Sequence, residues 1–151
     1  MAGKPNDVPP RVRVRRGPKK GRYDRESIDA VLDRGLLAHV AFADGDGAVC
    51  IPMLYARVGD TVYIHGSTAS RAVRLLGAGA PACITVTLVH ALVLARSAFE
   101  HSANYDSVMV FGRFALQHSS RPAGGVPEQS TPCALQSRVL QRQTGFSTTR
   151  A

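Results

Sequence analysis

Cysteine is scarce in this sequence and is not arranged for metal binding or redox exchange. The chain has only Cys50, Cys83 and Cys133, and no two of them form a C-x-x-C pair. An odd number without such a pair favours a reduced, cytoplasmic setting over a disulfide scaffold. Metal-ligand spacing is also missing among the five histidines, which are His39, His65, His90, His101 and His118. A structural zinc site is therefore not expected.

Long apolar runs and two common enzyme fingerprints are missing as well. The longest mainly apolar stretch, residues 82–95, is too short and too interrupted to cross a bilayer. The first ten residues do not look like a signal peptide. Neither G-x-S-x-G nor G-x-G-x-x-G occurs. We expect a soluble protein with no membrane partner and without these hydrolase or dinucleotide-binding motifs.

Acidic residues are few near both ends, where the positive charge gathers. Of the formal net charge of +8, residues 1–22 carry +7 and residues 113–151 carry +4, whereas residues 23–112 carry −3. A basic arm of this kind can bind nucleic-acid phosphates, which is one candidate function. The arm offers only Tyr23, at its edge, for base stacking, and such runs are more often solvated or partner-clasping extensions. Nucleic acid is therefore the minor candidate.

The centre of the chain consists mainly of short strand patterns. Apolar alternation and turn residues predict strands over residues 36–43, 48–58, 61–66, 82–89, 92–99 and 105–114. One helix is predicted after Asp24, which serves as its N-cap, with Gly35 as its stop, and a second near residues 69–76. Six meandering strands with one inserted helix favour a small closed or split barrel.

The second predicted strand carries two unusual features. Its residues are apolar on both faces, which predicts burial on both sides and hints at a subunit interface. It also contains Pro52, which cannot donate a hydrogen bond to a ladder and so marks a bulge or a gap in the sheet. In a gap, free backbone groups could bind the edge of a flat heteroaromatic ring. Both interpretations of Pro52 stay open.

The stretch YIHGSTASRAVRLL places a cation at the start of a helix. Arg71 stands in the opening turn beside Ser67 and Ser70, and residues 61–99 contain no acid. A cation is mildly unfavourable at that end of a helix. Hydroxyls, backbone N–H groups and a fixed cation together are suited to a phosphate. The alternative is that Arg71 is a solvated surface residue and the hydroxyls only cap the helix.

Two longer segments, IPMLYARVGDTVYIHGSTASR and LVLARSAFEHSANYDSVMVFG, resemble a known family. With the strand order, they are similar to the pyridoxamine 5′-phosphate oxidase-like FMN-binding split barrels, in the flavin-nucleotide-binding branch related to nitroimidazole reductases. The resemblance covers residues 11–114. It implies a mainly β fold, namely a six-stranded split β-barrel with short flanking helices, and a homodimer that shares two FMN molecules at its interface.

The same resemblance implies an FMN-dependent oxidoreductase. The substrate would be a small-molecule acceptor, with a reduced nicotinamide or a deazaflavin as electron donor. Ala72 follows Arg71 where the oxidases proper have a lysine, so vitamin B6 oxidation is not implied. Glu100 and Asp106 replace basic or histidine residues of relatives, which would weaken phosphate binding. An inactive remnant of the family is the alternative.

The resemblance also assigns roles to individual residues. Ser70 and Arg71, with Ser67 nearby, match the step that holds the FMN phosphate. His65 matches a histidine on the substrate side of the flavin and is the catalytic candidate. The residues that would border the flavin ring are Ile51, Pro52, Met53, Tyr63 and His65. A partner subunit would contribute Ser97, His101, Asn104 and Tyr105.

The composition changes after residue 114. All glutamines of the chain lie beyond it, at Gln117, Gln129, Gln136, Gln141 and Gln143. We therefore divide the chain into a basic N-terminal arm (1–22), an FMN-binding split-barrel domain (23–114) and a tail (115–151). The tail is expected to be disordered or the product of a frameshift, and composition does not separate these two origins.

Overall fold

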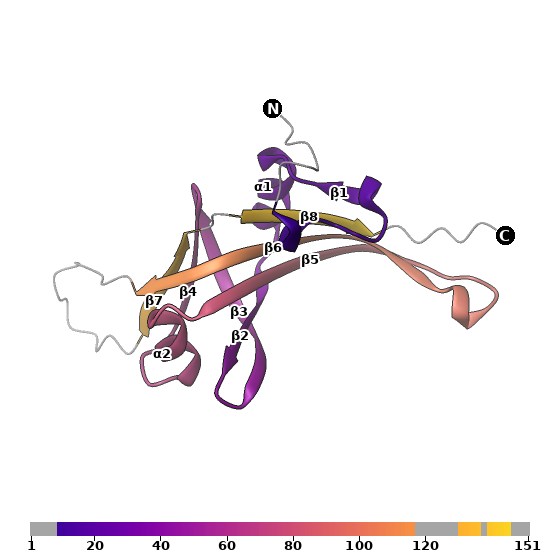
Figure 1. Ribbon diagram of the computed structural model, residues 1–151. Coiled ribbons are helices and arrows are strands. Elements are labelled where there is room, and N and C mark those ends of the chain that lie inside the picture. Colours follow the sequence, from indigo (N-terminus) through magenta and orange to yellow (C-terminus); the bar gives the residue numbers. More distant parts are fainter. Residues whose placement is uncertain (1–8, 117–129, 137–138, 146–151) are drawn as a thin grey trace. The chain divides into compact units, whose positions relative to one another are not determined.

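The computed structural model describes residues 9–116, 130–136 and 139–145 (Figure 1). Within them the chain forms two compact units. Of the described residues, the pocket unit comprises 36–84, 110–116, 130–136 and 139, and the hairpin unit comprises 9–35, 85–109 and 140–145. Each unit is mainly built from antiparallel strands.

The helices and strands follow one another along the chain without long connections before residue 116. Two α-helices are described, α1 (Arg25–Arg34) and α2 (Arg71–Gly77), together with the short 3-10 helices η2 (Pro10–Val12), η3 (Pro18–Lys20) and η4 (Ala98–Glu100). The strands are β1 (Gly21–Arg22), β2 (Leu37–Asp44), β3 (Gly47–Val58), β4 (Thr61–Ser67), β5 (Pro81–Val93), β6 (Ser102–Leu116), β7 (Ser130–Gln136) and β8 (Val139–Gly145). The predicted mainly β, split-barrel class is thereby confirmed.

Helix α1 forms as its sequence predicts. The Asp24 side chain accepts a hydrogen bond from the Ser27 backbone N–H at 2.9 Å, which satisfies one of the unpaired donors of the first turn. Gly35 follows the last residue, and its N–H donates to the Val31 carbonyl. The buried face consists of Ile28, Val31 and Leu32, spaced by three and four residues as one helical stripe requires.

The pocket unit is built around an antiparallel meander. Strand β2 pairs with β3 from Leu37↔Leu54 to Asp44↔Gly47, and β3 pairs with β4 from Tyr55↔Ile64 to Val58↔Thr61. Its apolar core is formed by alternate residues of the strands and one face of α2, including Ala38, Val40, Phe42, Val62, Ile64, Val73, Leu76, Ile84, Val110 and Phe114. This is the predicted meander with its inserted helix.

Strand β3 changes partner at Tyr55. Residues 47–54 pair with β2, whereas pairing with β4 begins only at Tyr55. The one-to-one register opposite β2 runs through His39↔Pro52, so Pro52 lies in a regular ladder and not in a bulge. Of the two interpretations left open, the gap beside β3 is the correct one.

The prediction that this strand is buried on both faces is wrong for the single chain. Residues of β3 alternate between half-buried and exposed positions. Leu54 is 60% exposed and pairs with Leu37, which is 46% exposed. The apolar second face is present, as the sequence shows, but no part of this chain covers it within the described residues.

The far edge of β4 is paired by a segment that the sequence did not predict as a strand. Residues Thr61–Ser67 pair with β7 along the whole of that strand, and β7 also pairs with the end of β6. Strand β8 pairs with β1. The structure therefore differs from the expected disordered tail in these two segments. The other tail residues lie outside the described part, and the frameshift origin stays a hypothesis.

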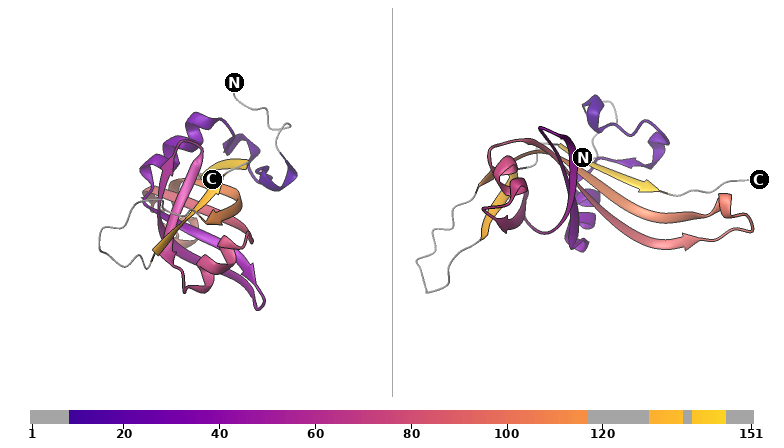
Figure 2. Two further views of the ribbon diagram at one scale, coloured as in Figure 1. Left: turned by 90° about the vertical axis from the view of Figure 1, so that its left-hand side faces the viewer. Right: turned by 90° about the horizontal axis from the view of Figure 1, so that it is seen from below.

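Strands β5 and β6 form a long hairpin, which Figure 2 shows ending at η4, and the hairpin unit contains its residues 85–109. The predicted separate strand at 92–99 is wrong, because β5 continues to Val93. The His90–Ala91 step, which separates the strands predicted at 82–89 and 92–99, lacks the glycine or asparagine that tight hairpin turns prefer. The hydroxyls of Thr87 and Ser107 are hydrogen-bonded at 3.0 Å across the two strands.

The basic segment before β1 has an ordered apolar side. Val12 and Val14 are buried, whereas the arginines that alternate with them are exposed. The Val14 N–H donates to the Tyr23 hydroxyl at 2.8 Å. Residues 9–22 therefore pack by their valines and present their basic side chains to solvent.

Among the described residues, no helix is both long enough and apolar enough to pass through a bilayer.

Two close approaches hold α2 in the pocket unit. A Cβ built on Gly66 would lie 2.8 Å from Val73 Cγ2, and one on Gly77 would lie 2.7 Å from Leu116 Cγ. Strand β4 and the last residue of β6 thus approach the helix at positions where only hydrogen fits.

We predict that Gly66→Ala lowers the free energy of unfolding by about 1–3 kcal/mol, because the added methyl overpacks against the buried Val73. Urea denaturation measures the change. Gly45→Ala is the matched control, since a Cβ there meets nothing within 4 Å. Equal midpoints for the two variants would contradict the close approach of β4 to α2.

Candidate functional site

Where β3 and β4 separate, backbone N–H and C=O groups on their facing edges have no partner strand among the described residues. The Tyr55 N–H donates to Leu36 O at 3.4 Å, so Tyr55 directs its polar groups toward β2. Because these directions alternate along a strand, Pro52 and Leu54 direct theirs toward the gap. Pro52 presents only a carbonyl, and its missing N–H costs the β2–β3 ladder nothing.

Strand β4 faces the same gap from the other side. Tyr63 pairs with Ala56, and the same alternation directs the N–H and C=O of His65 to the side of β4 on which β3 has separated. A flat ligand with hydrogen-bonding edges could therefore meet donors and acceptors on two strand edges.

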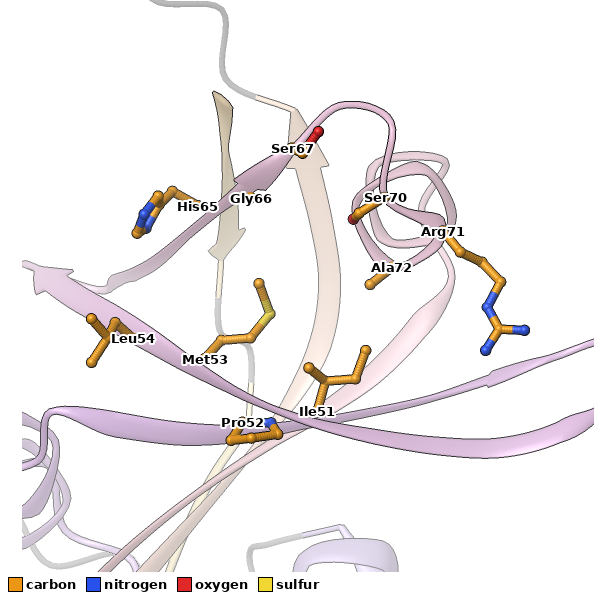
Figure 3. Close-up of a pocket in the computed structure, with 10 residues that line it drawn as sticks. All are labelled: Ile51, Pro52, Met53, Leu54, His65, Gly66, Ser67, Ser70, Arg71 and Ala72. Carbon is orange, nitrogen blue, oxygen red and sulfur yellow. The ribbon is translucent and has the colours of Figure 1, made fainter. Parts of the chain in front are cut away.

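A pocket of about 440 Å³ lies at this gap (Figure 3). Its size falls in the range of small-molecule and cofactor sites. Figure 3 shows His65 toward one end, Arg71 toward the other, and Met53 and Ile51 between them. The lining residues are Ile51, Pro52, Met53, Leu54, His65, Gly66, Ser67, Ser70, Arg71 and Ala72.

The serine end of the pocket is organised by the turn between β4 and α2. The Ser70 hydroxyl accepts from the Val73 N–H at 3.0 Å, and the Ser67 hydroxyl accepts from the Ala69 N–H at 3.2 Å. The Ser67 carbonyl accepts from the Ser70 N–H at 2.9 Å. The Ser70 hydroxyl therefore caps α2 and the Ser67 hydroxyl stabilises the preceding turn, and each still has its own O–H to donate to a ligand.

Arg71 has a partner that the local sequence did not reveal. Its Nη1 lies 2.9 Å from Oδ2 of Asp44, at the end of β2. The contact is an ion pair without good hydrogen-bond geometry, and the Asp44 side chain is only 6% exposed. The expectation that no acid offsets Arg71 is thus wrong, because the acid comes from a strand 27 positions earlier in the sequence. Arg71 itself is 59% exposed and remains accessible from the pocket.

The histidine end is open to solvent. His65 is exposed and lines both this pocket and a neighbouring hollow of about 300 Å³, which it shares with Tyr63 and Leu54. Tyr63 is half-buried and lines the second hollow but not the larger pocket. Eight site residues were predicted to come from the same subunit as the phosphate-binding group, and all of them except Tyr63 line the larger pocket.

The remaining predicted residues belong to the hairpin unit. Ser97 precedes η4, and His101 accepts from the Ala95 N–H through Nδ1 at 3.0 Å. Asn104 and Tyr105 are half-buried on β6. Since the resemblance assigns these four to a partner subunit, their role stays a prediction.

Of the two acidic residues that replace basic or histidine residues of relatives, Glu100 and Asp106, the second forms a contact within its own hairpin. Asp106 Oδ2 lies 3.0 Å from Nε2 of His90. This contact joins β5 and β6 of the same unit.

Three lining residues and one ion-pair partner were missed by sequence reasoning. Leu54, Gly66 and Ala72 sit directly beside predicted positions, and their strand or helix neighbours were the available signal. Asp44 carried no such signal, because its contact depends on how β2 lies against α2.

Known proteins that are similar to this chain, in sequence or in structure, have the same fold. The family model for pyridoxamine 5′-phosphate oxidase matches residues 24–124. No curated protein sequence matched the chain. Among solved structures, the flavocytochrome Anf3 from Azotobacter vinelandii is 29% identical, with a TM-score of 0.80, over 92% of this chain and 75% of that one.

Two further structures have the same fold. The FAD and haem binding protein from Mycobacterium smegmatis is 28% identical, with a TM-score of 0.75, over 87% of this chain and 76% of that one. A FAD-binding protein from Mesorhizobium loti is 12% identical, with a TM-score of 0.64, over 83% of this chain and 99% of that one, which bears on the fold alone.

Proposed function

The chain belongs to the pyridoxamine 5′-phosphate oxidase family, and from this premise we propose that it binds a flavin nucleotide, FMN, in the pocket between β3, β4 and α2 and acts as an oxidoreductase. The proposal rests mainly on one observation, namely that two features line the same pocket. One is the open edge of the β3 ladder, and the other is the group formed by Ser67, Ser70 and Arg71.

The phosphate would bind at the serine end. Two hydroxyl donors and an accessible guanidinium suit a phosphate monoester, and hydrogen bonds to charged groups are stronger than those to neutral ones. The phosphate is therefore expected to supply most of the affinity.

The ring system would bind along the gap. Ile51, Met53 and Leu54 offer apolar surface, and the strand edges beside Pro52 and His65 offer backbone donors and acceptors. Such a mixture suits a flat heteroaromatic ring with polar edges.

FAD is the alternative nucleotide. The protein from Mycobacterium smegmatis named above binds FAD and haem, and the one from Mesorhizobium loti binds FAD. The feature that favours FMN is that Ser67, Ser70 and Arg71 come from one short segment at the start of α2, a small group of polar side chains that suits one terminal phosphate. Titration with both nucleotides distinguishes the two.

Bound flavin would supply the redox chemistry, and the protein would supply binding, orientation and electrostatics. His65 is exposed and lies at the end of the pocket opposite Arg71, and in this proposal it would contact the small acceptor. The proposed donor is a reduced nicotinamide or a deazaflavin. Ala72, in place of the oxidases' lysine, argues against vitamin B6 oxidation.

We further propose that the protein is a homodimer. The exposed Leu37 and Leu54 pair on one face of the β2–β3 ladder, and apolar surface of this kind marks interaction sites. A partner on this face would also bring a second chain to the edge of the pocket. The residues predicted to come from the partner subunit, Ser97, His101, Asn104 and Tyr105, could then contact the flavin.

We predict that Arg71→Ala weakens FMN binding at least tenfold, because charge-assisted hydrogen bonds contribute about 1.5–3 kcal/mol each. Flavin fluorescence titration measures the change. Riboflavin, which lacks the phosphate, should bind the wild type and the variant about equally. Arg74→Ala, an exposed arginine on the same helix outside the pocket lining, is the control. Equal FMN affinity in the two variants would remove Arg71 from the site.

Replacing His65 with alanine should leave FMN affinity nearly unchanged and alter the rate at which bound flavin exchanges electrons. Stopped-flow absorbance, with reduced nicotinamide as donor, follows the rate. His39→Ala on β2, outside the pocket lining, is the matched control. Loss of binding without a change in rate would show that the imidazole serves the cofactor and not the substrate.

Light scattering with FMN present should give the mass of two chains. Leu37→Glu should shift that mass toward one chain, because a charge placed on the exposed apolar face opposes its burial. A single-chain mass for wild type with FMN bound would rule out the shared site.

A further inference from the structure

A nearly buried carboxylate lies beside the cation of the proposed phosphate site. Oδ2 of Asp44 is 2.9 Å from Nη1 of Arg71, and Asp44 is the last residue of β2. The sequence gives no sign of this contact, since residues 61–99 contain no acid. The charge of Arg71 is thus partly offset before any ligand binds.

The two partners differ in how firmly they are held. The Asp44 side chain is 6% exposed, and its Oδ1 accepts from the Asp46 backbone N–H at 3.0 Å, which anchors it in the β2–β3 turn. The Arg71 side chain is 59% exposed and lines the pocket. Of the two side chains, Arg71 is the less constrained, so it is the one that can change its conformation when a ligand binds.

The direction of Arg71 matters for ligand binding. Figure 3 shows its guanidinium extended away from the hydroxyls of Ser67 and Ser70. A phosphate held by those hydroxyls could be reached by the same guanidinium only if the pair with Asp44 is loosened or shared. A phosphate monoester carries about −1.5 to −2 at neutral pH, so it would also meet the negative charge of Asp44.

We propose that Asp44 competes with the flavin phosphate for Arg71 and so lowers the affinity of the pocket for a doubly charged phosphate. The proposal rests on the flavin-binding function given above. Asp44 is a specificity-determining residue in this sense, because its effect depends on ligand charge. Riboflavin has no phosphate, and each phosphate of FAD carries a single negative charge because it is esterified once and joined to the other by an anhydride bond. The penalty at a site for one phosphate therefore decreases from FMN to FAD to riboflavin.

The test uses Asp44→Asn, which removes the charge and keeps an oxygen to accept from the Asp46 N–H. FMN should bind at least about fivefold more tightly, because its phosphate no longer has to displace Asp44 from Arg71. Even in water an attraction between two unit charges about 4 Å apart contributes about that factor. FAD should gain less, and riboflavin should not change. Asp46→Asn is the control, since Asp46 is an exposed acid of the same turn and carries the same charge.

The gain should also depend on the cation. In an Arg71→Ala background, Asp44→Asn should give a much smaller gain for FMN, because the two side chains act as a coupled pair. Circular dichroism checks that each variant is folded. If Asp44→Asn does not fold, Asp44→Ser keeps an acceptor for the turn and gives the same comparison.

Unchanged or weaker FMN binding in the folded variant would overturn the proposal, since Asp44 would then be neutral or would orient Arg71 for the ligand. An equal gain for riboflavin, or an equal gain in Asp46→Asn, would overturn it too. If neither the wild type nor any variant binds a flavin, the proposed function itself fails, which is a different result from flavin binding that ignores Asp44.

Discussion

The change of partner along β3 is the constraint on which the rest of the site depends. At Tyr55 the strand passes from a ladder with β2 to a ladder with β4, so the edges beside Pro52 and His65 separate. In a continuous sheet the backbone N–H and C=O groups of these edges would pair with each other, whereas separated strands leave them available to a ligand. The same separation gives α2 its place, because β4 then approaches the helix at Gly66, where no side chain fits.

Much of this could be predicted from local sequence. Apolar segments bounded by turn residues located β2, β3 and β4, and a capping aspartate located α1. Pro52 indicated an interruption in the sheet. Ser67, Ser70 and Arg71 were recognisable because hydroxyls and a cation stood together in one turn. In each case the signal lay within a few residues of the feature that it described.

The rest depended on contacts between distant parts of the chain. Asp44 could not be identified as the partner of Arg71, because the two residues are far apart in the sequence and only the fold brings them within contact distance. Strand β7 was missed because its apolar residues, Cys133, Ala134 and Leu135, do not alternate with polar ones, and the strand is defined by its pairing with β4. The expected burial of both β3 faces failed because apolar residues show what can be covered and not which chain covers it. The exposed pair Leu37 and Leu54 is the physical trace of that difference.

Flavin binding is the central claim, and an absorbance and fluorescence titration of FMN with the purified full chain tests it most directly. The expected result is saturable binding of one FMN per chain, with a shifted flavin spectrum and markedly weaker binding of riboflavin. Absence of any spectral change together with an unchanged melting temperature in excess FMN would contradict it. The family fold would then be present without its cofactor site.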